Sequence, residues 1–276
     1  MKAEPQGSGL LAALVGDALR RIAAARASRR DLERRAARAA VPPDFGAALA
    51  GGPAVAVIAE IKRRSPSAGA LWRADDVAAL AGTLEAAGAA ALSVLTEPVH
   101  FGGALADLSA AAAAVRLPVL RKDFILDPVQ LYEARAHGAA AVLLIVRILE
   151  AGRLAELAAA ARAIGLATLV EVHGPAELGT ALAAQPAAIG VNARDLDTLA
   201  MDRGLVEGLI GRIPAGRVAV AESGLSHRED VEAVAARGAD AVLVGAAIAG
   251  APDPASALRA LVGVVRRPET RRGSRP

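Results

Sequence analysis

The segment Val55-Ala56-Val57-Ile58-Ala59-Glu60-Ile61-Lys62-Arg63-Arg64-Ser65-Pro66-Ser67 starts as an apolar run and ends in a carboxylate, an ammonium and a turn. The run predicts a buried strand, and because strand side chains alternate between faces, Glu60 and Lys62 share one face, roughly 6 to 7 Å apart along the chain. A Glu-x-Lys pair is ordinarily a surface ion pair of little energetic weight. Its place at a strand end makes it a candidate site.

Lysine usage strengthens that interpretation. Of 32 basic residues only Lys2, Lys62 and Lys122 are Lys, and the rest are Arg. Lys62 and Lys122 both end apolar runs, which indicates chemistry that needs a compact ammonium with an adjustable pKa. We expect Lys122, beside Arg121, to have a lowered pKa because cationic neighbours and burial both disfavour its charged form.

Composition indicates a cytoplasmic, soluble protein. The 276 residues are 54% hydrophobic but only 2% aromatic, so the core must consist of Ala, Val, Leu and Ile. The absence of Cys excludes disulfides and thiolate metal sites. The chain contains neither an apolar signal core at its start nor an uncharged apolar run of 18 residues, so we expect no membrane association.

The basic character of the chain lies mainly at its two ends. The pI is about 9.9 but the formal net charge is only +3. Residues 20–38 hold eight Arg against two acids, and residues 266–276 hold five Arg against one Glu. With so few aromatic side chains to stack on bases, we expect no nucleic-acid partner, and an anionic small molecule as substrate.

A repeating pattern of short apolar run, polar loop and Ala/Leu-rich helical stretch predicts the fold. The predicted strands are residues 55–61, 90–95, 119–121, 140–145, 167–172, 188–191, 218–221 and 241–244, and the helices between them are 75–87, 105–115, 128–137, 150–164, 175–184, 205–210, 226–237 and 254–262. Nearly continuous apolar strands indicate a parallel sheet covered by helices. Eight such units predict an α/β fold, a closed (β/α)8 TIM barrel.

The predicted organisation is an N-terminal helical extension (1–50), the barrel (51–265) and a basic flexible tail (266–276). The extension is predicted as a helix from about Leu11 that continues to about Ala40, before Val41-Pro42-Pro43. A doubly wound open sheet and an Ala-rich helical repeat scaffold were the alternatives. The even spacing of eight units disfavours the first, and the lack of residue identity between units disfavours the second.

In a barrel the active site lies at the carboxyl ends of the strands, so polar residues there form one candidate constellation. These residues are Glu60, Lys62, Ser65, Ser93, Glu97, Lys122, Phe124, Glu171, Asn192, Arg194, Glu222 and Ser223. Individually each could be a loop cap, but together they predict an enzyme. The four His lack ligand spacing, so we expect no metal.

The last two units carry a phosphate-site pattern. Ser223 and Gly224 follow one predicted strand, and Gly245 and Ala246 follow the next. Gly lets backbone N–H groups approach an anion, and the helix that follows offers a positive dipole end. We assign the Ser226 side chain to a capping box with Glu229, and not to the ligand.

Six motifs, in order, resemble the indole-3-glycerol-phosphate synthase family of tryptophan biosynthesis from about Leu10 to Leu261. They are Ala59-Glu60-Ile61-Lys62-Arg63-Arg64-Ser65-Pro66-Ser67, Ser93-Val94-Leu95-Thr96-Glu97, Leu120-Arg121-Lys122-Asp123-Phe124-Ile125, Leu169-Val170-Glu171-Val172-His173, Val191-Asn192-Ala193-Arg194-Asp195-Leu196 and Ala221-Glu222-Ser223-Gly224. The resemblance implies a cofactor-free carboxy-lyase that closes 1-(2-carboxyphenylamino)-1-deoxyribulose 5-phosphate to an indole, with loss of CO2 and water.

The resemblance also implies residue roles. Lys122 would be the acid for ring closure, and Lys62 and Glu171 the acid and base for dehydration. The orienting residues would be Glu60, Asn192 and Glu222, with Phe124 and Arg194 at the aromatic end and Ser223, Gly224 and Gly245 at the phosphate, assisted by Lys62. How proton transfers divide between Lys62 and Lys122 stays open.

Two departures from the family pattern stand out. Many members have Lys at the position of Ala68, and a hydroxyl or acidic residue is common where this chain has Ala246. The alternatives are other phosphate-binding barrels, namely a phosphoribosylanthranilate isomerase-like or a class I aldolase-like enzyme. We expect a monomer or a weak homo-oligomer.

Overall fold

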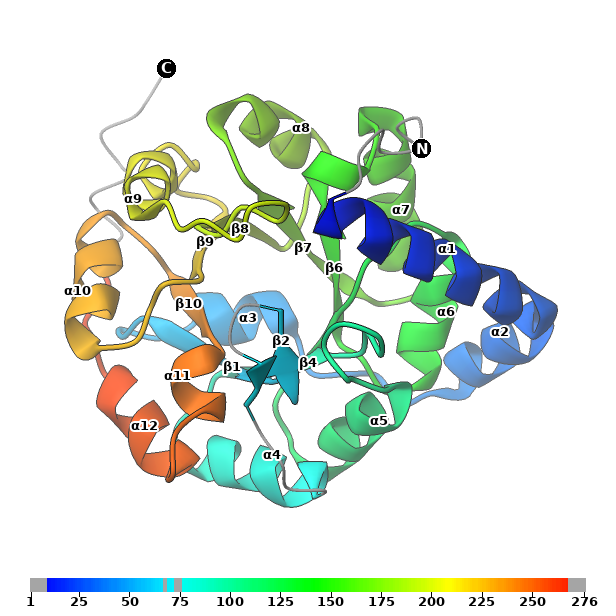
Figure 1. Cartoon of the computed structure of the whole chain (residues 1–276), viewed down its shortest axis with the longest axis horizontal. Coiled ribbons are helices and arrows are strands. Elements are labelled where there is room, and N and C mark those ends of the chain that lie inside the picture. The colour runs from blue at the N-terminus through cyan, green and yellow to red at the C-terminus, as the bar shows by residue number, and fades with distance from the viewer. Residues whose placement is uncertain (1–8, 67–68, 72–75, 268–276) are drawn as a thin grey trace.

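The structure, a computed structural model, describes residues 9–66, 69–71 and 76–267, and it contains a closed parallel barrel (Figure 1). The strands are β1 (Ala56–Ile61), β4 (Ala91–Leu95), β5 (Val119–Lys122), β6 (Ala141–Ile145), β7 (Ala167–Val172), β8 (Ala188–Asn192), β9 (Val218–Glu222) and β10 (Ala241–Val244). Their order around the barrel is the order of the chain, and β1 closes the ring by pairing with β10. The predicted (β/α)8 barrel is confirmed.

Helices surround the ring of strands on the outside (Figure 1). They are α4 (Val77–Ala86), α5 (Leu105–Ala114), α6 (Pro128–Ala136), α7 (Ala151–Ala163), α8 (Leu178–Ala183), α9 (Arg203–Ile210), α10 (Arg228–Ala236) and α12 (Pro254–Leu261), with short turns η1 (Val146–Ile148), η2 (Pro175–Glu177) and α11 (Ala246–Ala249). Gly88, Gly138 and Gly238 follow helices with φ of +100°, +85° and +95°. Gly takes this left-handed conformation without a Cβ clash, so the predicted helix ends are confirmed.

The N-terminal extension forms two helices, so the prediction of one continuous helix was wrong. α1 (Leu10–Ala27) ends at Ser28, whose N–H bonds back to the Ala25 carbonyl at 3.0 Å, and α2 (Arg29–Arg38) then starts in a new direction. The break lets Leu32 and Ala36 bury themselves while α2 packs on α6 beside the barrel (Figure 1). α1 buries Leu11, Leu14, Val15, Ala18 and Ile22.

Two further elements were not predicted. α3 (Phe45–Ala50) starts at Asp44, whose side chain accepts the Ala47 N–H at 3.0 Å, and packs its buried Phe45 and Leu49 against β1, β4 and β9. After β1, the strands β2 (Arg64–Ser65) and β3 (Gly69–Ala70) form a small antiparallel pair. Ala68, where the chain departs from the family pattern, and residues 268–276 of the predicted tail lie outside the described residues.

The capping box at the start of α10 differs from the predicted one by one residue. Asp230, and not Glu229, accepts the backbone N–H groups of Ser226 and His227 at 2.8 and 2.9 Å. His227 is therefore the capping position. The Ser-x-x-Glu pattern was matched in the wrong register because a second acid follows the first.

The core consists of small and branched aliphatic side chains, as the composition predicted. The strands are buried along almost their whole length, with Ala and Val prominent among the fully buried residues. Within the described residues, none of the helices combines the length and apolarity that a membrane crossing requires.

Candidate active site

A cavity of about 200 Å³ opens at the carboxyl ends of the strands. Its lining includes most of the predicted site residues, namely Glu60, Lys62, Ser65, Lys122, Phe124, Glu171, Asn192, Arg194, Ser223, Gly224, Gly245 and Ala246. Of the other predicted residues, Ser93, Glu97 and Glu222 are buried and do not line it. The residues come from six of the eight strands or from the loops that follow them. Strand alternation explains the convergence, because it aims alternate side chains of each strand into the barrel.

Glu60 connects the two lysines at the floor of the cavity. Its Oε1 lies 2.7 Å from Lys62 Nζ, and its Oε2 lies 3.6 Å from Lys122 Nζ. Burial by itself would raise the pKa of Glu60, but the two ammonium groups outweigh burial and lower it. Glu60 therefore stays ionised and fixes the position of both cations.

Three carboxylates surround Lys122. Besides Glu60, the Oε2 atoms of Glu171 and Glu222 lie 3.9 and 3.7 Å from Lys122 Nζ. Burial would lower the pKa of Lys122, but the charges of the three glutamates raise it above the ordinary Lys value. The ammonium form is therefore held firmly at neutral pH.

The expected lowering of the Lys122 pKa was thus wrong. The expectation relied on Arg121 as a cationic neighbour, but successive strand residues point to opposite faces. The Arg121 guanidinium lies in a buried network outside the floor, 3.0 Å from Asp123 and 2.8 Å from Glu133. The carboxylates that control Lys122 come from three other strands.

Glu222 lies behind the cavity wall, 1% exposed. Burial raises its pKa well above the ordinary range, and the neighbouring charge of Glu171 adds to the effect. Space for this side chain comes from Gly190, where an added Cβ would collide with Glu222 Oε1. Sequence analysis missed Gly190, although a Gly inside an apolar strand indicates a close approach of some kind.

Part of the cavity lining is apolar and aromatic. Phe124 lies there together with Phe101, Leu10 and Leu14. The last two belong to the N-terminal extension, which therefore forms part of the cavity. Sequence analysis did not identify Phe101, Leu10 or Leu14, because each is also explained as a core-facing apolar residue.

Asn192 and Arg194 hold each other at the end of β8. The Arg194 N–H donates to Asn192 Oδ1 at 3.0 Å, and the Arg194 guanidinium donates to the Leu199 carbonyl at 3.2 Å. The loop between them and Met201 is closed by a β-bridge from Arg194. These contacts fix a guanidinium at the rim of the cavity.

The first of the two loops predicted to bind phosphate has a tight backbone. Ser223 and Gly224 follow one another with φ of +67° and +72°. A left-handed Ser costs energy and is typically found at functional turns. Gly245 lies directly against the floor, since an added Cβ would collide with Glu60 Oε1 and lie 3.0 Å from Lys62 Nζ. The Lys62 ammonium is therefore adjacent to the second loop.

Glu97 has a structural role that the sequence did not reveal. It is completely buried, and its carboxylate accepts the backbone N–H groups of Val99, His100 and Phe101 at 2.7 to 2.9 Å. Glu97 therefore caps its own loop and does not line the cavity. Its place in the predicted constellation was wrong.

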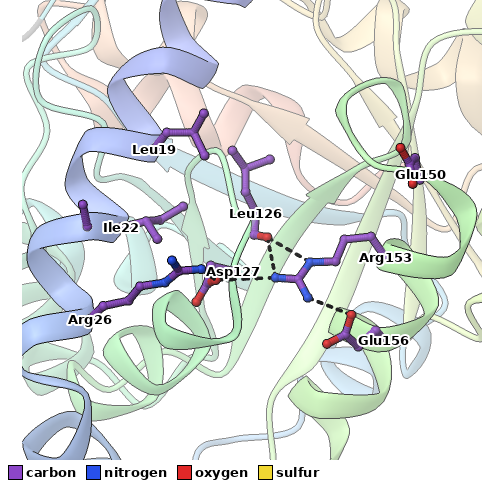
Figure 2. Close-up of a pocket in the computed structure, with 9 residues that line it drawn as sticks. Leu19, Ile22, Arg26, Leu126, Asp127, Glu150, Arg153 and Glu156 are labelled. Carbon is purple, nitrogen blue, oxygen red and sulfur yellow. Dashed lines mark hydrogen bonds and ion pairs between the residues drawn. The ribbon is translucent and has the colours of Figure 1, made fainter. Parts of the chain in front are cut away.

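A larger cavity, of about 490 Å³, lies elsewhere, between α1 and the loop before α6 (Figure 2). Its charged groups pair with one another: Arg26 binds Asp127 at 2.6 Å, and Arg153 binds Glu156 at 2.7 Å. Arg153 also donates to the Leu126 carbonyl, as Figure 2 shows. None of the predicted site residues lines this cavity, and its Arg side chains pair with its acids. It is therefore a gap in the interface between α1 and the barrel, and not the candidate active site.

Acid–base side chains and phosphate-type loops at one barrel mouth define a (β/α)8-barrel enzyme. The family model described as indole-3-glycerol phosphate synthase matches residues 11–261. An indole-3-glycerol phosphate synthase of Streptomyces coelicolor is 51% identical over 249 residues, covering 90% of this chain and 92% of its own. That of Mycobacteroides abscessus is 46% identical, covering 92% and 94%. The chain belongs to the indole-3-glycerol phosphate synthase family.

A comparison of structures gives a more distant relationship. A thiamine phosphate pyrophosphorylase from Pyrococcus furiosus superposes with a TM-score of 0.54, covering 74% of this chain and 92% of that one, at 17% identity. At this identity the likeness shows the shared fold alone.

Proposed function

We propose that this enzyme closes 1-(2-carboxyphenylamino)-1-deoxyribulose 5-phosphate to indole-3-glycerol phosphate, with loss of CO2 and water. The observation that carries the proposal is the floor, where one buried ammonium, that of Lys122, faces three carboxylates within 4 Å. Family membership selects this reaction over the isomerase-like and aldolase-like alternatives.

Lys122 suits the first chemical step. The electron-rich aromatic carbon attacks the C2 carbonyl, and the new alkoxide must be protonated. An ammonium held in its protonated form by carboxylates can donate that proton or stabilise the oxyanion. Decarboxylation then restores the aromatic electrons, and the C2 hydroxyl remains to be removed.

Lys62 and Glu171 suit the dehydration step. Lys62 lies 2.7 Å from Glu60, and Glu171 approaches Lys122 from β7 at 3.9 Å. One can protonate the departing hydroxyl while the other accepts a proton from the substrate. Glu60, Asn192 and Glu222 orient these groups and the sugar hydroxyls, with Ser65 at the rim of the cavity.

The two kinds of cavity lining, the loops after β9 and β10 and the apolar side chains, indicate how the substrate would lie. The phosphate would bind at Ser223, Gly224, Gly245 and Ala246, where backbone N–H groups and Lys62 are available. The aromatic ring and its carboxylate would face Phe124 and Arg194. The reacting ribulose carbons would then lie over Lys122.

One assay tests the proposal. Purified enzyme with the anilino-ribulose phosphate should yield indole fluorescence at a rate that EDTA leaves unchanged and that inorganic phosphate inhibits competitively. Absence of product would refute the function, and loss of activity in EDTA that Mg²⁺ restores would refute the metal-free, cofactor-free mechanism. Borohydride should fail to trap substrate on a Lys, in contrast to a Schiff-base aldolase.

The proposal includes a cytoplasmic location, a small phosphorylated substrate as the partner, and no nucleic-acid or membrane partner. A monomer or weak homo-oligomer is expected, which size-exclusion chromatography over a range of protein concentrations will test.

A further inference from the structure

His173 is a buried titratable group that the proposed chemistry does not use. It directly follows β7, and its side chain is 1% exposed. Nδ1 has no hydrogen-bond partner among the described residues, and Nε2 has only an ion-pair contact, without hydrogen-bond geometry. The residue lies behind the cavity wall and is not part of its lining.

The imidazole lies close to the carboxylate of Glu171, the proposed base. Nε2 of His173 lies 3.3 Å from Glu171 Oε1. The other oxygen of that carboxylate, Oε2, lies 3.9 Å from Lys122 Nζ. The Glu171 carboxylate is therefore placed between an imidazole on one side and the reacting ammonium on the other.

The backbone at this point is fixed independently of the ring. The His173 N–H donates to Glu177 Oε2 at 2.7 Å, and the other oxygen of Glu177 lies 3.7 Å from Arg147 Nε. Arg147 in turn binds Asp195 at 2.7 Å. The end of β7 thus has its own anchor, and the imidazole is not needed for it.

A buried imidazole without hydrogen bonds destabilises a fold, since each unsatisfied polar group costs about 1–3 kcal/mol. Leu would fill a similar volume here without that penalty. The fold therefore offers no reason for His at this position, whereas the neighbouring carboxylate does.

We propose that His173 is a positioning residue for Glu171: its Nε2 side holds carboxylate oxygen Oε1, so that Oε2 faces Lys122 and the substrate. The inference rests on the proposed function, because Glu171 is the base of that reaction. A carboxylate free to rotate would lose alignment with the proton it must take, and small misplacements of a reacting group can lower a rate by about 10²-fold.

The test compares His173→Leu with His173→Gln, whose side-chain amide nitrogen reaches about as far as Nε2. We expect His173→Leu to lower kcat about 10- to 100-fold with KM nearly unchanged, and His173→Gln to restore most of kcat. Because His173→Leu removes two buried nitrogens and breaks no hydrogen bond of the ring, its Tm should equal or exceed that of wild type. In a Glu171→Gln background, His173→Leu should have little further effect.

His137→Leu is the matched control. His137 lies at the end of α6, away from the cavity, and its Nδ1 is 2.7 Å from Ser109 Oγ. This variant should lose stability and keep kcat, the reverse of His173→Leu.

Wild-type enzyme is assayed first, so the two proposals fail separately. An inactive wild type refutes the proposed function. If the wild type is active, two results overturn the positioning role. One is a kcat for His173→Leu within twofold of wild type. The other is a loss of activity in His173→Leu that tracks a lowered Tm and that His173→Gln does not rescue.

Discussion

At the scale of single residues, the identity of Lys122 matters more than its charge. Three carboxylates hold its ammonium within 4 Å, in a space shaped for one compact cation. A guanidinium carries the same charge but is planar and larger, and it cannot take the place of a compact ammonium among three carboxyl groups. We expect Lys122→Arg to be nearly as damaging as Lys122→Met, with kcat reduced by about 10²- to 10⁴-fold and KM changed much less.

Steady-state kinetics check this expectation. They compare the two Lys122 variants with Lys62→Arg and Lys62→Met. If Lys62 mainly holds the phosphate, Lys62→Arg should retain more activity than Lys62→Met. A Lys122→Arg enzyme within a fewfold of wild-type kcat would move the general-acid role to Lys62.

Glu222 predicts a pH dependence of stability. Its pKa is raised by burial and by the charge of Glu171, so the folded state binds a proton more tightly than the unfolded chain does. The stabilisation from that proton is complete below the unfolded carboxyl pKa of about 4.3 and is lost as pH rises towards the folded value. Glu222→Gln mimics the protonated form at every pH.

The Tm of Glu222→Gln minus that of wild type should therefore increase from pH 4.5 to pH 8. Thermal denaturation of both proteins across this pH range measures the difference. Glu97→Gln is unsuitable as a control because Glu97 caps its loop. Asp31→Asn, in an exposed ion pair on α2, is suitable and should give a nearly constant difference. A constant difference for Glu222→Gln as well would show that its carboxyl is ionised in the folded state.

At the scale of elements, the N-terminal extension serves both the cavity and the barrel. Arg21 on α1 binds Asp123 with two hydrogen bonds of 2.8 Å, at the residue between Lys122 and Phe124. Burial would raise the pKa of Asp123, but Arg121 and Arg21 hold it far below the ordinary range. Leu10 and Leu14 of the same helix line the cavity.

Removal of residues 1–40 should leave a folded barrel with a lower Tm and a raised KM. Folding should persist because Asp123 keeps its contacts with Arg121 and with Thr96, at 3.0 and 2.6 Å. Circular dichroism, thermal denaturation and steady-state kinetics test this, and Arg21→Met separates the ion pair from the apolar wall. An unfolded truncated chain would make the extension part of the folding unit.

The success of prediction from sequence also varied with the element. The eight strands were found within one or two residues because buried parallel strands are continuous apolar runs, which local sequence shows directly. α3 was missed because it is short, and the break at Ser28 was missed because only packing on α6 requires it. Local signals do not record contacts made with distant parts of the chain.

The candidate site shows the same division. Positions such as Lys122, Glu171 and Asn192 were predictable because strand alternation and the barrel mouth determine where they meet. The direction of the Lys122 pKa was not, because its neighbours lie on other strands and only the register brings them within 4 Å. Which carboxylate caps a loop, as Glu97 does, depends on loop geometry in the same way.

At the scale of the whole molecule, the barrel is closed by contacts between the two ends of its chain. The N–H of Val55, just before β1, donates to the Val264 carbonyl at 2.7 Å, and the Arg266 N–H donates to the Pro53 carbonyl at 2.9 Å. The Arg266 side chain binds Asp240 and also reaches the carbonyls of Ala50 and Gly52. Arg266, the first residue of the predicted tail, is therefore attached to the barrel.

Arg266→Met should lower stability without changing catalysis. Asp240 is 2% exposed and would lose the Arg266 guanidinium, while the Ala219 N–H at 2.8 Å is among the contacts that it keeps. Breaking a buried pair on one side costs about 3 kcal/mol. For a domain of this size we expect a fall in Tm of about 5–10 °C. The site lies at the other end of the strands, so kcat and KM at 25 °C should be unchanged.

Thermal denaturation and kinetics test Arg266→Met, with Arg267→Met at the exposed neighbouring residue as control. The comparison separates the effect of the lost Arg266 contacts from the effect of the lost positive charge. Both variants remove one positive charge, so an effect of net charge would lower both Tm values equally. Arg266 joins Asp240, just before β10, to the end of α3 and the segment between α3 and β1, so its loss should loosen the contact between β1 and β10. Equal Tm values for wild type and Arg266→Met would mean that the backbone bonds of Val55 and Arg266 close the barrel unaided.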